Sequence, residues 1–171
     1  MSFITPKEEQ VRFKLESADL LDLDILTITW ETKPEIVEKL LPKPLEPFDR
    51  PLVQSYIANF RKSNFGPGYL ESSLSLICKY NGEVGAYFLA MPVSKGMPVA
   101  YGREYFGYPK KTAKVKLKRI FNTAFGCTTR HGIKFLKMRA HFLRKITEEQ
   151  AKEAMRLASY KLPVKTKFIV K

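Results

Sequence analysis

The dipeptide Asn81-Gly82 separates two apolar stretches, residues 72–80 and 84–91, and this arrangement predicts a β-hairpin. Asparagine and glycine both tolerate the positive φ angles that a two-residue hairpin turn requires. Other stretches rich in β-branched and large apolar residues predict strands at 21–30, 51–60, 113–121, 125–129, 133–142 and 162–170. Many strands beside few helices indicate a mainly β fold, with an antiparallel sheet curled toward a barrel.

Two short helices are predicted from their starting patterns. Residues 32–35 form a capping box with a proline in the first turn, and an apolar stripe follows at Ile36, Val37, Leu40 and Leu41. Residues 147–150 repeat the capping pattern before a second helix, whose apolar face would hold Ala151, Ala154, Met155 and Ala158. Residues 6–15 fit either a helix or a strand.

The chain reads as one domain, residues 1–171, because no linker, repeat or low-complexity segment divides it. Its apolar runs are much shorter than the ~20 residues of a membrane-spanning helix. The first residues carry acids and a proline where a secretory signal would carry an apolar stretch. We therefore expect a cytoplasmic protein with no membrane partner.

The formal net charge of +13 favours anionic partners, which include nucleic acids and small anionic substrates. The lysines are spread along the chain and alternate with apolar residues, as at Lys114, Lys116 and Lys118. Such alternation is typical of the solvated face of a half-buried strand, so we expect no nucleic-acid partner. A basic nucleic-acid-binding β-domain remains the alternative from a different functional class.

The sequence holds few groups that bind metals. Cys78 and Cys127 lie far apart, and we expect both to be small buried apolar residues. Neither cysteine has a histidine at metal-ligand spacing, since the two histidines are His131 and His141. A glycine-rich phosphate loop is also missing, so we expect neither a metal nor a cofactor.

The segment from Tyr101 to Lys111 contains four aromatic residues, two glycines and a Lys-Lys pair. A lysine is a nucleophile only when it is neutral, and an ordinary lysine, with a pKa near 10.4, is protonated at neutral pH. Burial and a neighbouring cation both favour the neutral form. In a regular strand Lys110 and Lys111 would point to opposite faces, so burial would contribute most. Gly102 and Gly107 permit tight turns or a close approach of the backbone.

This segment, Gly102-Arg103-Glu104-x-x-Gly107-Tyr108-Pro109-Lys110-Lys111, resembles the active-site signature of the acetoacetate decarboxylase family. Three other segments resemble parts of the same family: Leu-Pro-Lys-Pro-Leu-Glu at 41–46, Pro-Leu-Val at 51–53 and Tyr-Leu-Glu-Ser at 69–72. The likeness extends from about residue 21 to residue 162.

The resemblance implies a barrel-like fold of this family and a cofactor-independent decarboxylase acting on a small anionic β-keto acid such as acetoacetate. It also implies that Lys110 forms a Schiff base with the substrate, that Lys111 activates Lys110, and that Glu71 orients the substrate or relays a proton. Related imine chemistry, such as that of an aldolase or dehydratase, and a non-catalytic ligand-binding relative are the alternatives.

The sequence departs from the family at two positions of the active site. Leu23 stands where the decarboxylases have an arginine, and Tyr56 stands where they have a second glutamate. Tyr56, Arg103 and Glu104 are candidate substrate-binding residues, and Arg61 is another cation able to hold a carboxylate. Arg103 fits a structural role equally well, paired with Glu71 or Glu104.

Family members also continue well past the position of Val170, with strands that complete the barrel. We expect those strands either to be missing here or to be supplied by a partner subunit. Because an unpaired sheet edge promotes aggregation, we expect a homo-oligomer.

Overall fold

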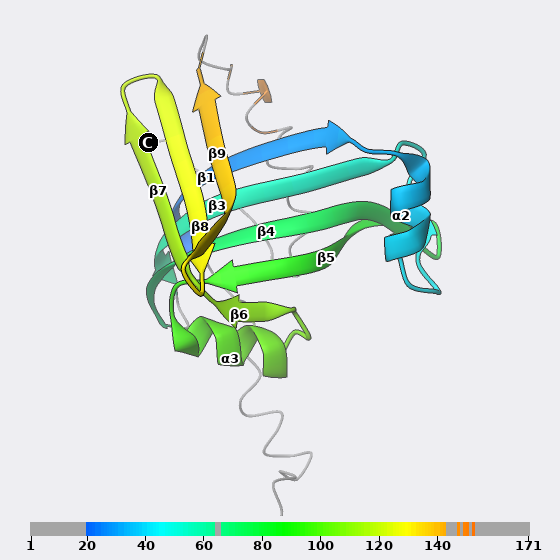
Figure 1. The fold of residues 1–171 in the computed structure, drawn as a ribbon, viewed down its shortest axis with the longest axis horizontal. Coiled ribbons are helices and arrows are strands. Elements are labelled where there is room, and N and C mark those ends of the chain that lie inside the picture. The colour runs from blue at the N-terminus through cyan, green and yellow to red at the C-terminus, as the bar shows by residue number, and fades with distance from the viewer. Residues whose placement is uncertain (1–19, 64–65, 143–146, 148, 151, 153–171) are drawn as a thin grey trace, which may run out of the picture.

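The computed structural model describes residues 20–63, 66–142, 147, 149–150 and 152, which form two β-sheets and two helices (Figure 1). The elements follow one another as β1 (Leu20–Glu31), α2 (Pro34–Leu40), β2 (Glu46–Pro47), β3 (Leu52–Ser63), β4 (Gly66–Tyr80), β5 (Glu83–Val93), α3 (Gly96–Glu104), β6 (Lys110–Thr112), β7 (Lys114–Ile120), β8 (Thr123–Arg130) and β9 (Ile133–His141). No helix among the described residues has the length and hydropathy needed to cross a bilayer.

The larger sheet has the strand order β1-β3-β4-β5-β6, and β2 pairs with β4 outside this path. The four long strands pair antiparallel, as predicted. The edge strand β6 instead runs parallel to β5, with Lys110 opposite Met91, so the antiparallel prediction is wrong at this edge. A parallel return requires a crossover connection, and α3 lies in the connection between β5 and β6.

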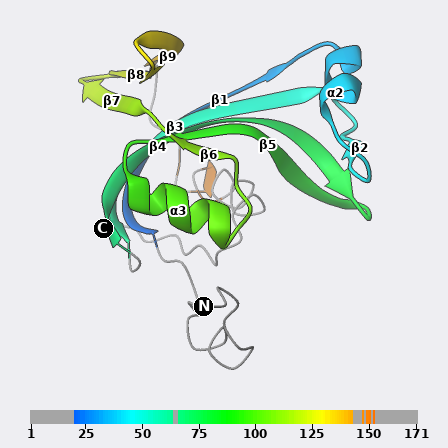
Figure 2. The same ribbon diagram turned by 60° about the horizontal axis from the view of Figure 1, so that its bottom comes forward.

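The last three strands form a second sheet in the order β7-β8-β9. This sheet crosses one end of the larger sheet steeply, and α2 lies at the opposite end (Figure 1). Figure 2 shows β6 and α3 together at the edge of the larger sheet. Neither sheet closes on itself within the described residues, so the predicted barrel is wrong for this part of the chain. The physical reason is that the chain leaves the larger sheet after the short β6 and builds a separate layer.

The core is divided between the two faces of the larger sheet. One cluster joins the two sheets and consists of Leu26, Ile57, Val115, Ala124 and Met138. Because neighbouring residues of a strand point to opposite faces, Tyr56 belongs to the other face, in a cluster with Ala58, Phe60, Tyr69 and Val93. A third cluster joins α2 to the larger sheet through Val37, Val53 and Leu76.

Two tight turns between paired strands have left-handed backbone geometry. Asn81 and Gly82 have φ angles of 49° and 81°, and His131 and Gly132 have φ angles of 49° and 79°. The hairpin prediction at Asn81-Gly82 is therefore confirmed. The second turn joins β8 to β9 in the same way.

The helix predicted near residue 32 is α2, but it begins at Lys33 without a side-chain cap. The predicted capping box of Thr32 is wrong because the backbone N–H of Thr32, one residue before the cap, donates to Pro51 O over 2.9 Å. The second capping pattern is confirmed, since Thr147 and Gln150 each accept a backbone hydrogen bond from the other. The apolar face predicted for that helix lies outside the described residues, as do residues 6–15 and 162–170.

Candidate functional site

The site lies on the face of the larger sheet that points away from the smaller sheet. Glu71 in β4 is on this face, and only 3% of its side chain is exposed. Its neighbours across the β3–β4 ladder are Ala58, opposite Glu71, and Tyr56, opposite Ser73. The Tyr56 hydroxyl reaches diagonally along the ladder and donates a hydrogen bond of 2.5 Å to Glu71 Oε1.

Lys110 approaches the same carboxylate from the edge strand β6, which is separated from β4 by β5. Its side chain is 8% exposed, and its Nζ lies 2.7 Å from Glu71 Oε2. Among the described residues Lys110 is the only partner of that oxygen. Tyr56, Glu71 and Lys110 therefore form one buried group, which we call the Lys–Glu–Tyr site. A buried charge that has lost its hydration needs partners of this kind.

The rest of the Lys110 side chain is enclosed by a helix and two aromatic rings. A Cβ atom at Gly102 in α3 would lie 2.5 Å from Lys110 Cε and 3.1 Å from Nζ, so a side chain there would force the end of the lysine to move. Lys110 Nζ lies 5.6 Å from the ring centroid of Tyr69 and 5.7 Å from that of Tyr108. The Lys110 side chain is therefore enclosed by α3 and by the rings of Tyr69 and Tyr108.

The sequence suggested that Gly102 allows a close approach of the backbone, and the structure confirms it. Gly107 adopts a φ of 68°, in the left-handed region, at the turn after α3. The backbone N–H of Tyr108 then donates to Gly102 O over 2.9 Å. This turn directs the chain back so that β6 begins with Lys110.

The phenols around the site hold their protons tightly. Burial raises the pKa of Tyr56 well above its ordinary value, and the charge of Glu71 and the hydrogen bond to it act in the same direction. Burial, followed by the charge of Glu71, also raises the pKa of Tyr69, and these two causes raise the pKa of Tyr108 to about 12. Tyr56 is therefore a hydrogen-bond donor to the carboxylate at neutral pH.

Three other candidates are not brought into this buried group. Lys111 follows Lys110 in β6 and is exposed, as the alternation of side chains along a strand predicts. Arg103 and Glu104, at the end of α3, are also exposed. Glu71 is paired with Lys110, so the predicted pairing of Arg103 with Glu71 is wrong.

Two more candidates have partners elsewhere. Arg61 forms ion pairs with Asp22 and Asp24 on β1, and these carboxylates compete with any substrate carboxylate. Leu23 packs against the apolar cluster that contains Tyr56, so the two positions that depart from the family pattern are on the same face. Among the described residues no three His, Cys, Asp or Glu side chains gather as a metal site would require.

The sequence interpretation missed Tyr69 and Ser73 as residues of this face. Both lie two positions from Glu71 in β4, so the alternation of the strand was a usable signal. Alternation alone does not show which β3 side chains these residues meet, because that depends on the register between β3 and β4.

Residues 2–166 match the protein family described as acetoacetate decarboxylase (ADC). The chain belongs to the acetoacetate decarboxylase family. Two curated relatives, the acetoacetate decarboxylases of Burkholderia ambifaria (strain MC40-6) and Burkholderia cenocepacia (strain J2315), are each 38% identical over 98 residues. These residues are 57% of this chain and 39% of each relative, so the alignment spans about two fifths of the relatives' length.

Two solved structures show a similar fold. The acetoacetate decarboxylase of Legionella pneumophila superposes with a TM-score of 0.73 at 26% identity, covering 80% of this chain and 55% of that one. The enduracididine biosynthesis enzyme MppR, solved with the condensation product of pyruvate and imidazole 4-carboxaldehyde, gives a TM-score of 0.64 at 17% identity. It covers 70% of this chain and 53% of MppR, and at this identity the likeness concerns the fold alone.

Proposed function

We propose that the chain carries a Schiff-base-forming decarboxylase site for a small β-keto acid such as acetoacetate, with Lys110 as the nucleophile. The observation that supports this most is the buried contact of 2.7 Å between Lys110 Nζ and Glu71 Oε2. Membership of the acetoacetate decarboxylase family supports the same reaction type.

The reaction begins when Glu71 takes a proton from the Lys110 ammonium, which leaves a neutral amine beside a carboxylic acid. The amine attacks the keto carbon of the substrate, and the resulting carbinolamine loses water to give a protonated imine. The bond to the substrate carboxylate then breaks, and its electron pair moves into the enamine as CO2 leaves. A proton adds to the enamine carbon, and water hydrolyses the imine to release the ketone and the amine.

Glu71 and Tyr56 have different roles beside the Lys110 amine. Glu71 is close enough to exchange a proton with Nζ, and it can return that proton to the carbinolamine oxygen or to the enamine carbon. Tyr56 holds the other carboxylate oxygen and fixes its direction. The apolar walls formed by Tyr69 and Tyr108 keep water from the imine until CO2 has left and the enamine has been protonated.

Lys111, Arg103 and Glu104 have outer roles in this proposal. Lys111 contributes positive potential from the solvent side of β6, where it is exposed. Arg103 and Glu104 lie at the end of the helix that encloses Lys110, where they can meet the substrate as it enters.

Borohydride trapping tests the proposal. Reduction in the presence of acetoacetate should leave an isopropyl group on Lys110 if decarboxylation precedes reduction, and mass spectrometry of peptides locates it. An adduct that retains the carboxyl group would instead identify a ligand-binding relative without turnover. Lys110→Ala should abolish the adduct, while Lys111→Ala keeps the adduct site and serves as the matched control. An adduct that persists in Lys110→Ala contradicts the proposal.

The positions of Leu23 and Tyr56 favour related imine chemistry as a second outcome of the same site. With an apolar side chain and a phenol where the family has an ionic pair, the site suits substrates other than acetoacetate. Pyruvate offered with an aldehyde tests this alternative. A condensation product without CO2 release would assign aldolase or dehydratase chemistry to Lys110.

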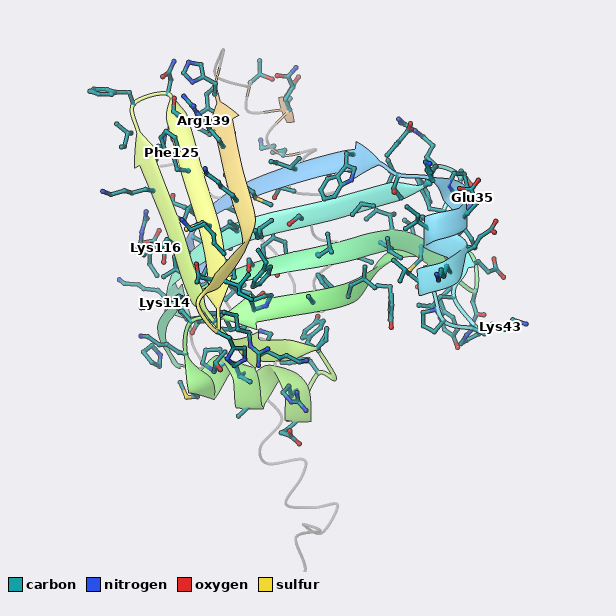
Figure 3. The ribbon with its side chains drawn as sticks, viewed as in Figure 1. Glu35, Lys43, Lys114, Lys116, Phe125 and Arg139 are labelled. Atoms are coloured by element: carbon teal, nitrogen blue, oxygen red, sulfur yellow. The ribbon has the colours of Figure 1, made fainter. Side chains whose placement is uncertain are left out.

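A nucleic-acid-binding role is the second candidate function, and the charge of the smaller sheet favours it. No acidic residue occurs between Glu104 and Glu148, whereas β7 to β9 and their turns carry Lys114, Lys116, Lys118, Arg119, Arg130, Lys134, Lys137 and Arg139. Figure 3 shows Lys116, Phe125 and Arg139 on this sheet, remote from α2. A groove of about 390 Å³ there combines five of these cations with the ring of Phe125: Lys116, Lys118, Lys134, Lys137 and Arg139. Cations beside exposed aromatic rings are typical of single-strand binding surfaces.

Fluorescence anisotropy with a labelled oligonucleotide, measured from low to physiological salt, tests this role. Binding should weaken steeply with salt and be lost in the triple variant Lys116→Glu, Lys118→Glu, Lys137→Glu. The triple variant Lys33→Glu, Lys39→Glu, Lys43→Glu changes the charge equally at the α2 end and should still bind. Equal losses in the two variants would assign the effect to net charge alone.

A further inference from the structure

Ser73 carries a buried hydroxyl to which the described part of the chain offers no partner. Its side chain is in β4, the residue is 2% exposed, and Oγ has no hydrogen-bond partner among the described residues. The other buried serines of β3 and β4 are all bonded: Ser55 Oγ donates to Ser73 O, Ser72 Oγ accepts from Thr128 Oγ1, and Ser75 Oγ donates to Gln54 O. A buried polar group without a partner costs free energy, so this exception requires an explanation.

Ser73 is on the same face of the sheet as the Lys–Glu–Tyr site. It follows Glu71 by two residues, and it is the direct cross-strand neighbour of Tyr56. Two residues of a strand span roughly 6.5 Å, so the Cα atoms of Glu71 and Ser73 are about that far apart on one face. A span of this size matches a small keto acid attached to Lys110.

Among the described residues, neither Arg61 nor Arg103 is placed to hold a substrate carboxylate in the buried site. Arg61 is paired with Asp22 and Asp24, and Arg103 is exposed. The leucine at position 23 places an apolar side chain on this face. Among the described residues of the buried site, the free donor is therefore a neutral hydroxyl.

We propose that Ser73 is a substrate-binding residue whose hydroxyl donates a hydrogen bond to the carboxylate of a β-keto acid attached to Lys110. This inference rests on the proposed Schiff-base function and adds the group that holds the departing end of the substrate. A neutral donor orients the carboxylate without the strong ground-state stabilisation that an arginine would give. Because that carboxylate loses its charge as CO2 leaves, weak binding of the ground state favours the reaction.

The test compares acetoacetate with acetone, which forms the same kind of imine but has no carboxylate. In Ser73→Ala the KM for acetoacetate should rise about tenfold, the effect of one lost hydrogen bond to a charged group. The rate of borohydride trapping with acetone should remain unchanged. Ser75→Ala is the matched control, since Ser75 is two residues further along the same face and its hydroxyl is already bonded.

The thermal midpoint of the unliganded protein separates a binding role from a structural one. Ser73→Ala removes an unpartnered buried hydroxyl, so its midpoint should equal or exceed that of the parent protein. Ser73→Ala would overturn the assignment of Ser73 if it impaired the reactions with acetoacetate and acetone equally, or if it left the KM for acetoacetate unchanged. Either result would leave the imine chemistry of Lys110 intact. Failure of the parent protein to form any adduct at Lys110 would overturn the proposed function and this inference with it.

Discussion

Lys110 contacts a carboxylate, two aromatic rings and the backbone of one helix within a single buried site. The position of its amine is therefore set by several neighbours at once, and Gly102 is one of them. A side chain at Gly102 would occupy the space of Lys110 Cε.

Replacing Gly102 by alanine tests this packing. The new methyl group should displace the flexible end of Lys110 and slow borohydride trapping by about 100-fold, the usual cost of a misplacement of about 1 Å at a reacting group. Stability should change little, because the group that moves is the end of one long side chain. Gly96→Ala is the control, since nothing lies within 4 Å of a Cβ at that position of the same helix. Equal trapping rates in the two variants would show that Gly102 does not set the position of Lys110.

Tyr56→Phe should alter stability in two ways. Loss of the hydrogen bond to Glu71 should lower the free energy of unfolding at neutral pH by about 1.5–3 kcal/mol. The raised pKa of Tyr56 means that the folded protein keeps a proton that the unfolded chain loses above about pH 10, so this stabilisation is present below pH 10 and disappears as pH rises further. Urea titrations at pH 8, 10 and 11 measure the free energy of unfolding at each pH. This free energy should fall less steeply with pH in Tyr56→Phe than in the parent protein, by up to about 1.4 kcal/mol per pH unit. An identical pH dependence of the free energy of unfolding in the two proteins would contradict a raised pKa of Tyr56.

Several residues of the site could be identified from the sequence, but their contacts could not. The signature around Lys110 and the segment around Glu71 pointed to both residues, and strand alternation predicted that Lys111 would point away. The bond from Tyr56 to Glu71 depends on the register between two strands, which no local pattern encodes.

At the scale of elements, the sequence predicts structures that depend on adjacent residues, but not those that depend on contacts between distant residues. The turn at Asn81-Gly82 follows from the φ preferences of two adjacent residues. The helix α3 was missed because Gly96, Pro98 and Gly102 all disfavour a helix in isolation. It forms where Pro98 and Gly102 become buried, and the sequence alone does not reveal this.

The contact between the two sheets leads to a prediction about β8. A Cβ at Gly126 would lie 2.6 Å from Cδ1 of the fully buried Ile57. Gly126→Ala should therefore lower the free energy of unfolding by about 1–3 kcal/mol, as overpacking of a core usually does. Gly85→Ala in β5 is the matched control, because nothing lies within 4 Å of its added methyl group. Chemical denaturation of the two variants measures the difference, and equal midpoints would contradict this close packing.

At the scale of the whole molecule, positive charge is concentrated in the smaller sheet. With no acidic residue between Glu104 and Glu148, the cations of β7 to β9 repel one another. Added salt screens such repulsion, so the free energy of unfolding should rise by about 1 kcal/mol between 10 mM and 0.5 M NaCl. Urea titrations at the two salt concentrations measure this, and a fall in stability with salt would show that attractive ion pairs dominate.

The open edges of the two sheets are the reason for predicting a homo-oligomer. Within the described residues β1 and β6 are the edges of the larger sheet, and β7 and β9 are the edges of the smaller one. The homo-oligomer stays a prediction, and sedimentation velocity at micromolar concentration should give a mass above the 19.7 kDa of one chain. A single species at that mass would contradict it.

All three groups of the Lys–Glu–Tyr site come from one continuous stretch, between the start of β3 and the start of β6. A gene that carries this stretch carries all three groups, so recombination downstream of Thr112 can exchange the following strands without separating them. The condition for a working chimera is that the incoming layer still fits the surface around Ile57. Natural or engineered diversification can therefore act on the smaller sheet while these three groups are inherited together.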